Sequence, residues 1–425
     1  MEEPQPSSQS APPPRPKHRS YVNPSRTFAA LQFPNYRLWF IGQLSSLVGT
    51  WMQSTAQGYL VYELTQSPAF LGYVGLASGL PTWLFTLFGG VLSDRVSRRK
   101  LLIMTQGFAM LLAFILAALV FTKTVQPWHI IVLAFLLGVA NAFEAPARQS
   151  FVVEMVNREF MGNAIALNAA MFNLAMAVGP AFAGIMYASL GPAWCFTING
   201  ISFIFVIIAL AMMKIKPLQA VSRAKNPLLE LKEGFSYVLR TRTVMLLIAL
   251  MGVVSFFGLS FITLIPAWAV EVLNGNATIN GLLQSSRGIG ALIAALIVAS
   301  LGTTAKRGKL LTIGSIAFPI ALIIFSSIRN IPLSLITLLF AGWAFMTTAN
   351  LANALVQSTV PDALRGRVMG IYSFIFLGMY PLGSGLAGQV AERFSTPAAV
   401  LVSASVTLVV ALGVALFAPS VRRMR

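Results

Sequence analysis

Long apolar segments recur along the chain and are separated by short polar loops. Each holds about 20 mainly apolar residues, enough as a helix to cross a bilayer core roughly 30 Å thick. The segments lack the alternation of apolar and polar residues that a membrane β-strand shows. Since every backbone polar group in lipid needs a partner within its own segment, each segment is predicted to be a helix. We expect twelve membrane-spanning helices, at residues 37–64, 67–92, 100–122, 128–147, 162–189, 193–213, 242–272, 279–301, 308–328, 332–357, 364–391 and 397–418.

The composition indicates an all-α membrane protein. Of the 425 residues, 56% are hydrophobic and 10% are charged, and the mean hydropathy is +0.76. A soluble domain has about 25% charged residues and rarely exposes large apolar patches. We therefore expect a multi-pass membrane protein rather than a soluble protein.

The net charge of +18 indicates the orientation of the chain in the membrane. Of the 30 Lys and Arg residues, 26 lie in the two tails and in alternate loops, whereas Lys123, Arg329 and Arg393 lie in the other loops. The positive-inside rule assigns the basic loops to the cytoplasm. We therefore expect both termini in the cytoplasm and contact of the basic loops with anionic lipid head groups. Nucleic acid is not an expected partner, because membrane topology accounts for the charge.

The chain divides into two halves of nearly equal length. We expect a disordered cytoplasmic tail at 1–25, a six-helix bundle at 26–213, a cytoplasmic linker at 214–241, a second six-helix bundle at 242–418 and a cytoplasmic tail at 419–425. The halves echo each other: Pro180 and Pro381 are 201 residues apart, and each is followed four residues later by glycine. Such parallel repeats are found in transporters that bind substrate between the repeats, near the middle of the membrane.

The loop after the second predicted helix carries a distinctive segment, GVLSDRVSRRK, at residues 90–100. Gly90 would let the helix approach a neighbour closely. Asp94 would find cationic or helix-N-terminal partners at the cytoplasmic end of that helix. The alternative is that the basic residues only anchor the topology, although topology does not require Gly90 and Asp94.

This segment resembles the signature of the major facilitator superfamily, with Ser97 where that family usually has a second glycine. The resemblance implies a gate that latches the two halves in the outward-facing state and is formed by Gly90, Asp94, Arg95, Arg98 and Arg99. Further stretches, at 35–39, 58–65, 146–150, 164–168 and 364–369, resemble the group that includes the enterobactin exporter and macrolide and multidrug exporters. The resemblance covers nearly the whole chain beyond the tail and implies export by alternating access across a bacterial-type inner membrane.

The fifth predicted helix also resembles part of a motif of proton-driven exporters, through Gly179, Pro180 and Gly184. Alanine stands at positions 166, 175 and 183, where that motif prefers glycine. The resemblance adds Gly179 and Pro180 to the expected gate. The alternative is a kink that serves close helix packing without any role in antiport.

Polar residues recur at three- and four-residue steps in the first and tenth predicted helices, so each set forms a stripe on one helix face. Polar groups at membrane depth usually face the bundle interior or a water-filled cavity. The resemblance implies that the first, fourth, seventh and tenth helices line the central cavity. The alternative is that these groups bond between helices as packing contacts worth about 0.6 kcal/mol each. We expect a substrate cavity lined by Gln43, Thr50, Trp51, Gln53, Ser54, Gln57, Thr263, Gln284, Arg287, Trp343, Thr347 and Asn350.

Arg287 falls about eight residues into the eighth predicted helix. A charged residue at the centre of a helix costs about 2.5–3.5 kcal/mol on insertion, so a compensating contact is expected. Gln284 and Glu271 are the candidate partners. Our hypothesis is that Arg287 contacts an anionic group of the substrate or regulates the proton affinity of a carboxylate. The alternatives are a structural salt bridge and snorkelling to the surface.

Other chemistry is limited by composition. No carboxylate lies near the centre of a predicted span, so the candidates for proton coupling are Glu144 and Glu271, close to helix ends. The chain has one cysteine, Cys195, and two histidines far apart in sequence, which predicts no metal site and no nucleophile cluster. A glycine-rich nucleotide-binding motif is also lacking. We therefore expect no enzymatic activity and no cofactor.

These observations predict a secondary active transporter that acts as a monomer. Its expected activity is proton-coupled export of a small amphipathic molecule, such as a drug, a macrolide or a siderophore-like compound. One alternative is a transporter of lipids or of other small molecules with the same architecture. Another is a membrane receptor that transports nothing, in which the polar stripes would face neighbouring helices and leave no cavity.

Overall fold

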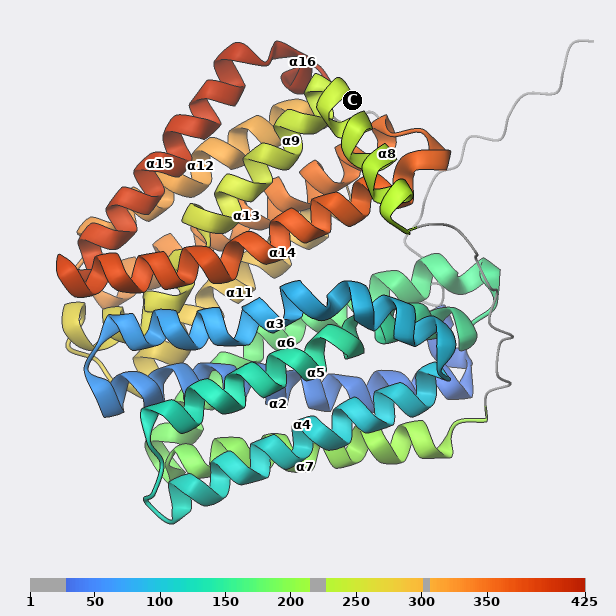
Figure 1. Cartoon of the computed structure of the whole chain (residues 1–425). Coiled ribbons are helices and arrows are strands. Elements are labelled where there is room, and N and C mark those ends of the chain that lie inside the picture. Colours follow the sequence, from blue (N-terminus) through green and yellow to red (C-terminus); the bar gives the residue numbers. More distant parts are fainter. Residues whose placement is uncertain (1–27, 215–226, 301–305, 425) are drawn as a thin grey trace, which may run out of the picture.

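The computed structural model describes residues 28–214, 227–300 and 306–424, and the described residues are almost entirely helical (Figure 1). The tail expected at 1–25 lies outside the described residues, as do residues 215–226 of the expected linker. Six long helices form the N-terminal half: α2 (Pro34–Thr65), α3 (Pro68–Arg95), α4 (Arg98–Phe121), α5 (Pro127–Phe151), α6 (Met161–Leu190) and α7 (Pro192–Met212).

The C-terminal half follows the helix α8 (Pro227–Arg240), which lies in the expected linker. Its first span is a broken helix that begins with α9 (Arg242–Val253) and contains the single turn α10 (Ile265–Ala267). Five further long helices complete it: α11 (Ala277–Ser300), α12 (Arg307–Ser327), α13 (Ile331–Thr359), α14 (Asp362–Arg393) and α15 (Thr396–Phe417). The expected C-terminal tail begins with the short helix α16 (Pro419–Arg422), where Val421 is buried and the Met424 carbonyl accepts from the N–H of Gly308 (3.1 Å).

Ten helical segments of the described chain are long and apolar enough to cross a membrane. Helices α2 and α3 are not among the ten, but they have 32 and 28 residues and pack within the same bundle. With them the chain has two sets of six long helices, as expected from the sequence. Each set builds its own apolar core: Trp39 packs edge-on against Phe151 in the first, and Trp268 stacks on Phe325 in the second.

Most of the long helices begin with proline or with a polar capping residue. Proline stands in the first turn of α2, α3, α5, α7, α13 and α15, where its missing N–H would have no helical partner anyway. The Asn276 side chain caps α11 by accepting from the N–H groups of Thr278 (3.0 Å) and Ile279 (3.2 Å). These local signals explain why the spans predicted from hydropathy agree with the helices to within a few residues.

The seventh span differs from the regular helix that hydropathy predicts. After α9 it passes through a π-helical turn (Val254–Gly258), a 3-10 stretch (Ser260–Leu264), α10 and a second π-helical turn (Trp268–Val272). Pro266 has no N–H to continue the helical bonds, and the Ser260 hydroxyl bonds the Phe257 carbonyl of its own turn (2.7 Å). The span is therefore irregular at mid-depth, where Thr263 lies.

The two halves meet along two helix pairs, α3 with α14 and α6 with α11. A glycine makes each crossing close: a Cβ atom on Gly79 would overlap the ring of Pro381, and one on Gly281 would overlap the carbonyl oxygen of Pro180. Small residues let helix backbones approach in this way inside a membrane. The two prolines are those that the sequence repeat places 201 residues apart, so the repeat marks equivalent crossing points in the two halves.

The halves touch at one end and separate towards the other. We call the end that holds α8 and α16 the linker side and the opposite end the far side. Tyr62, Gly58 and Ser54 follow one another at four-residue steps along one face of α2, from the far side towards the linker side. Tyr62 bonds Glu271 of the other half (2.7 Å), a Cβ atom on Gly58 would lie 3.5 Å from Pro266, and Ser54 is exposed. Figure 1 shows the two bundles diverging in the same direction, towards α8.

Closure of the far side is expected to depend on Gly79. In Gly79→Ala the new Cβ atom would lie 2.7 Å from Cβ of Pro381 and closer still to Cγ, whereas carbon atoms normally touch at about 3.5–4.0 Å. Helices α3 and α14 must then move apart by about 1 Å or more. Spin labels at the exposed positions Gln66 and Arg393, in a Cys195→Ser background, would report a longer mean distance by double electron–electron resonance.

Gly107→Ala is the control for this measurement, because a Cβ atom there would meet no heavy atom within 4 Å. Equal distance distributions in Gly79→Ala and Gly107→Ala would contradict the proposed role of the crossing.

Candidate functional site

The polar stripe of α2 lies between the rest of its own half and the C-terminal half. Gln43 and Gln57 are buried, Thr50 is half-buried, and Ser54 is exposed on the face that carries Gly58 and Tyr62. The Oε1 atom of Gln43 has no hydrogen-bond partner. This face of α2 therefore offers hydrogen-bonding groups towards the junction of the two halves.

Gln53 does not belong to that face. Its Oε1 atom accepts a hydrogen bond from Nδ2 of Asn199 on α7 (2.7 Å), and both side chains are buried. Helix α7 belongs to the same half as α2, so Gln53 makes a packing contact within the N-terminal half. The expectation that Gln53 lines the substrate cavity is corrected accordingly. Hydrophobic periodicity could not distinguish a cavity-lining residue from a packing residue, since Gln53 lies at the edge of the same stripe.

The Gly179-Pro180 pair lies where α6 passes between α2 and α11. A Cβ atom on Gly179 would lie 2.6 Å from Cβ of Trp51, whose ring packs edge-on against Phe172 of α6 (5.7 Å between centroids). The next residue, Pro180, presents its carbonyl oxygen to Gly281 of α11. The pair thus joins three helices, one of which belongs to the other half.

Thr263 and the predicted residues of α13 make their hydrogen bonds and ring contacts within the C-terminal half. Thr263 donates a hydrogen bond to Oγ of Ser384 (2.9 Å), beside the crossing of α14 with α3. Trp343 stacks on the exposed ring of Phe340 (5.3 Å), Thr347 bonds the carbonyl of its own helix, and Asn350 is half-buried.

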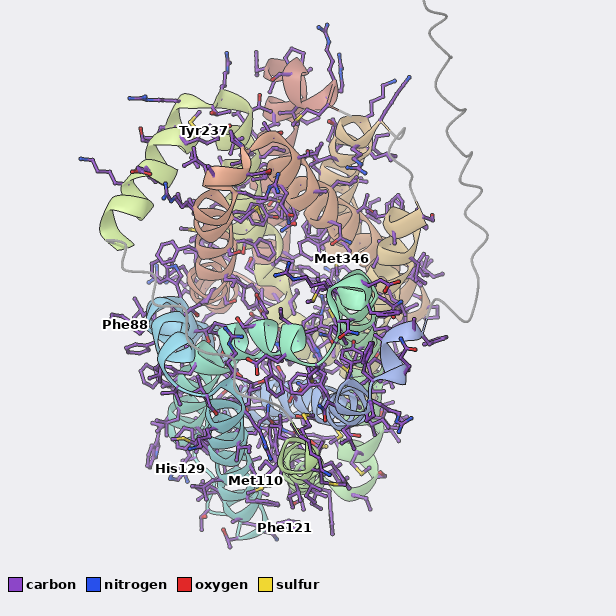
Figure 2. All side chains as sticks on the ribbon, turned by 90° about the vertical axis from the view of Figure 1, so that its right-hand side faces the viewer. Phe88, Met110, Phe121, His129, Tyr237 and Met346 are labelled. Atoms are coloured by element: carbon purple, nitrogen blue, oxygen red, sulfur yellow. The ribbon has the colours of Figure 1, made fainter. Side chains whose placement is uncertain are left out.

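Figure 2 shows the two bundles from the linker side, with Met346 of α13 labelled. Met346 of α13 lies near the boundary between them. In contrast, Phe121 and His129 lie at the opposite edge of the N-terminal bundle. The middle part of α13, which carries the predicted residues Trp343, Thr347 and Asn350, packs against α11, where a Cβ atom on Gly342 would overlap the carbonyl oxygen of Arg287.

Arg287 points away from lipid on α11. The exposed face of that helix carries Ile289 and Ile293, and the opposite face carries Asn280, Gln284 and Arg287, which are all buried. The side chain of Arg287 is only 6% exposed, which rules out snorkelling to the surface.

Neither of the two partners expected for Arg287 binds it. Gln284 donates its Nε2 hydrogen to Oδ1 of Asn280 (3.3 Å). Glu271 accepts hydrogen bonds from Tyr62 (2.7 Å) and Thr396 (2.6 Å) instead. Within the described chain Arg287 forms no ion pair, and its Nε atom is buried without a hydrogen-bond partner. The expectation of these partners is therefore wrong, because helix packing orients both groups elsewhere.

Two carboxylates of the C-terminal half hold the N-terminal half on the far side. Glu271 joins Tyr62 of α2 to Thr396 of α15. Glu392 of α14 accepts from the hydroxyl of Ser67 (2.7 Å) and the N–H of Ala69 (3.2 Å) at the start of α3. Sequence reasoning missed Glu392, because an acidic residue near the end of a helix is usually only a solvated surface group.

The other proton-coupling candidate, Glu144, is placed differently. It is buried in α5, and its nearest ion-pair partner is Arg148, one turn further along the same helix (3.9 Å). Both residues belong to the N-terminal half.

The predicted gate segment shows how serine replaces the usual glycine. Ser97 has φ −58°, so no left-handed conformation is required there. Its hydroxyl accepts from the N–H of Lys100 (3.2 Å) and so caps α4.

The close helix approach expected at Gly90 is made one residue earlier. A Cβ atom on Gly89 would overlap the carbonyl oxygen of Ala142 on α5, whereas one on Gly90 would meet no heavy atom within 4 Å.

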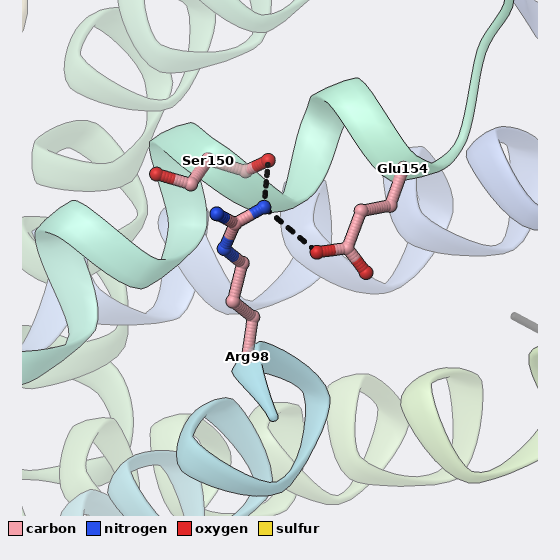
Figure 3. Close-up of polar contacts among 3 residues, drawn as sticks. All are labelled: Arg98, Ser150 and Glu154. Atoms are coloured by element: carbon pink, nitrogen blue, oxygen red, sulfur yellow. Dashed lines mark hydrogen bonds and ion pairs between the residues drawn. The ribbon is translucent and has the colours of Figure 1, made fainter. Parts of the chain in front are cut away.

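The basic residues of this segment bind within the N-terminal half. Arg98 forms an ion pair with Glu154 (2.8 Å) and also bonds the Ser150 carbonyl (3.4 Å), as Figure 3 shows. Arg99 bonds the Ala211 carbonyl at the end of α7 (2.6 Å). The side chains of Asp94 and Arg95 lie outside the described residues. Arg98 and Arg99 therefore do more than anchor the topology, because they tie α4 to α5 and α7.

An apolar groove of about 530 Å³ lies elsewhere, between α4 and α5, and contains none of the predicted substrate residues. It is lined by Met104, Thr105, Gly107, Phe108, Leu111, Val139, Ala140 and Phe143. Three of these side chains, Met104, Phe108 and Leu111, are exposed on the outer surface, where lipid would cover them. Within the described ranges, no group of three or more His, Cys, Asp or Glu residues could hold a metal ion.

The pair of Arg98 and Glu154 is expected to stabilise the N-terminal half. Their side chains are 24% and 9% exposed, so a double-mutant cycle with Arg98→Gln and Glu154→Gln should give a coupling energy of about 1 kcal/mol. Unfolding by titration with SDS in mixed micelles would measure it.

The pair of Arg365 and Asp362 is the matched control, with side chains 44% and 88% exposed. Its coupling energy should be about 0.5 kcal/mol or less. A coupling at Arg98 and Glu154 no larger than at this exposed pair would contradict the structural role.

The fold and the junction between its halves define a multi-pass membrane transporter of the major-facilitator type. The chain belongs to the transmembrane secretion effector family of that superfamily, whose profile matches residues 25–424. It is accordingly a transporter and not an enzyme.

Curated relatives match almost the whole chain at low identity. The staphyloferrin A transporter of Staphylococcus aureus is 26% identical over 84% of this chain and 90% of its own length. The multidrug efflux pump Tap of Mycolicibacterium fortuitum is 25% identical over 90% of this chain and 95% of its own length. The enterobactin exporter EntS of Citrobacter koseri is 24% identical over 92% of this chain and 94% of its own length. The resemblance inferred from the sequence is thereby confirmed.

Solved structures confirm the fold. The nucleoside transporter NupG superposes with a TM-score of 0.70 at 13% identity, covering 91% of this chain and 99% of its own. A bacterial homologue of the human lysosomal transporter Spinster, in an inward-facing and occupied conformation, gives a TM-score of 0.68 at 14% identity, covering 95% and 98%.

Proposed function

We propose that this chain exports small amphipathic molecules from the cytoplasm across a bacterial inner membrane, by proton-coupled alternating access. The observation that carries the proposal is the arrangement of the two halves. They touch on the far side through glycine crossings and hydrogen bonds, and they separate towards the linker side. Relatives that carry siderophores or drugs support a small-molecule substrate of this kind.

The positive-inside rule places the linker side in the cytoplasm, because that side carries most of the Lys and Arg residues. The described conformation is then inward-facing. A substrate would enter from the cytoplasm and meet the polar face of α2 and the buried face of α11. Rocking of one half against the other about the crossings would close the linker side and open the far side.

The crossings are suited to such motion. Their contacts are mainly van der Waals contacts between backbones and small side chains, which allow the helices to tilt against each other without stranding polar groups in lipid. The hydrogen bonds across the far side involve side chains near helix ends, where water can replace them. Ion pairs such as that of Arg98 and Glu154 stay within one half and would move with it.

Glu271 is the better of the two candidates for proton coupling. A bound proton can shift a conformational equilibrium only if its free energy differs between the two conformations. Protonation of Glu271 changes a contact between the halves, because its carboxylate accepts from Tyr62. The ion-pair contact of Glu144 lies within α5 and would be the same in both conformations of the transporter.

Accumulation of ethidium, erythromycin and a catecholate siderophore in an efflux-deficient bacterial host tests the proposal. Cells with the wild-type protein should accumulate less of at least one compound, and a protonophore should remove the difference. Glu271→Gln keeps an acceptor for Tyr62 but does not titrate. Cells with this variant should therefore accumulate the exported compound to within about twofold of the level in cells without the transporter.

Glu63→Gln is the matched control. Glu63 also lies near the far side and also accepts a hydrogen bond from a tyrosine, but that partner, Tyr187, belongs to the same half. Export by Glu63→Gln should therefore stay close to wild type. Equal loss in both variants would argue against coupling through Glu271. No wild-type effect on any compound, with the protein shown to be in the membrane, would overturn export of these classes.

A further inference from the structure

Arg287 and Glu144 are the two buried charged side chains of the described chain, and their surroundings differ. Glu144 has Arg148 within ion-pair distance (3.9 Å). Arg287 has no carboxylate partner among the described residues, and one of its nitrogens is buried without any hydrogen bond. A guanidinium group stays charged at any physiological pH, so Arg287 cannot escape this mismatch by losing a proton.

The backbone at Arg287 is closely packed at the junction of the halves. The next residue, Gly288, packs against α6 of the other half, where an added Cβ atom would lie 2.5 Å from the Met176 carbonyl oxygen. On the other side, Gly342 of α13 packs against the backbone carbonyl of Arg287. Helix α11 is thus clamped at this residue between α6 and α13, which fixes the point from which the Arg287 side chain extends.

The groups around Arg287 are neutral. Asn280 and Gln284 lie on the same buried face of α11 and bond each other. On α14, the hydroxyl of Tyr380 lies 3.4 Å from that of Thr263. These groups can add hydrogen bonds to a ligand but supply no negative charge.

We infer that Arg287 binds an anionic oxygen group of the transported molecule, of the carboxylate or catecholate class. This inference rests on the proposed function, since it requires that the junction admits a small molecule. The planar guanidinium matches two adjacent oxygens with two parallel hydrogen bonds, which an ammonium group does not. The substrate would complete an ion pair that the protein leaves half-formed, so that neutral and cationic analogues would bind less well.

Binding of a matched pair of probes tests the inference without any transport. Dansylglycine is a small amphipathic carboxylate, and dansylglycinamide is its neutral counterpart. The full chain in phosphatidylcholine nanodiscs should bind the carboxylate roughly tenfold or more tightly than the amide, measured by dansyl fluorescence. Arg287→Gln should abolish this preference, and Arg287→Lys should keep only part of it.

Arg393→Gln is the control, because that arginine is exposed on the far side. The thermal stability of the ligand-free protein adds a second readout. Removal of an uncompensated buried charge should leave the melting temperature of Arg287→Gln unchanged or raise it, whereas loss of a structural salt bridge would lower it.

Three outcomes would overturn the inference. The first is an equal preference for the carboxylate in wild type and Arg287→Gln. The second is no binding of dansylglycine to wild type up to about 1 mM. The third is loss of dansylglycine binding when phosphatidylglycerol is added to the nanodisc, which would assign the site to an anionic lipid head group. If export does not depend on Arg287, the inference on Arg287 fails but the proposed function does not. If export is absent, the proposed function fails but the binding result for Arg287 is unaffected.

Discussion

The structure depends on close backbone contact between two halves that have no hydrophobic reason to associate. Lipid tails are as apolar as leucine, so helices within a membrane gain little from burying apolar side chains against each other. The contacts that remain are van der Waals packing and a few hydrogen bonds. Here they are concentrated where Gly79 meets Pro381 and where Gly281 meets Pro180. The placement of α11 at Arg287 depends on further contacts of the same kind, at Gly288 and Gly342.

The junction combines weak contacts between the halves on the far side with a buried arginine that has no carboxylate partner. On the far side Glu271 and Glu392 hold the other half through hydrogen bonds that water can replace. Deeper in the junction Arg287 stays buried without an anion. A transporter has to bind its substrate in one conformation and release it in another, so neither conformation can be strongly preferred. Contacts of a few kcal/mol, together with a site that the substrate itself completes, fit that requirement.

Several features were predictable from local chemistry. Apolar runs and positively charged loops locate the helices, because lipid forces each segment to satisfy its own backbone. The proline repeat indicated two equivalent halves, and the structure adds that each proline lies where its helix crosses the other half. Other features were not predictable. Gln53 and Ser54 are neighbours on one polar stripe, yet one bonds α7 and the other is exposed. Ser97 stands where the family usually has a glycine, and that it caps α4 is seen only in the structure.

The sequence by itself determined the class of protein, the number and approximate ends of the helices, the division into halves and the presence of a costly arginine within a span. All of these follow from the energy of single segments in lipid. Only the tertiary structure decided which partners the polar residues have. Glu271 bonds Tyr62 and Thr396 instead of Arg287, and this pairing depends on how each helix is rotated about its axis. That rotation is fixed by contacts between residues more than 100 positions apart, which no local pattern encodes.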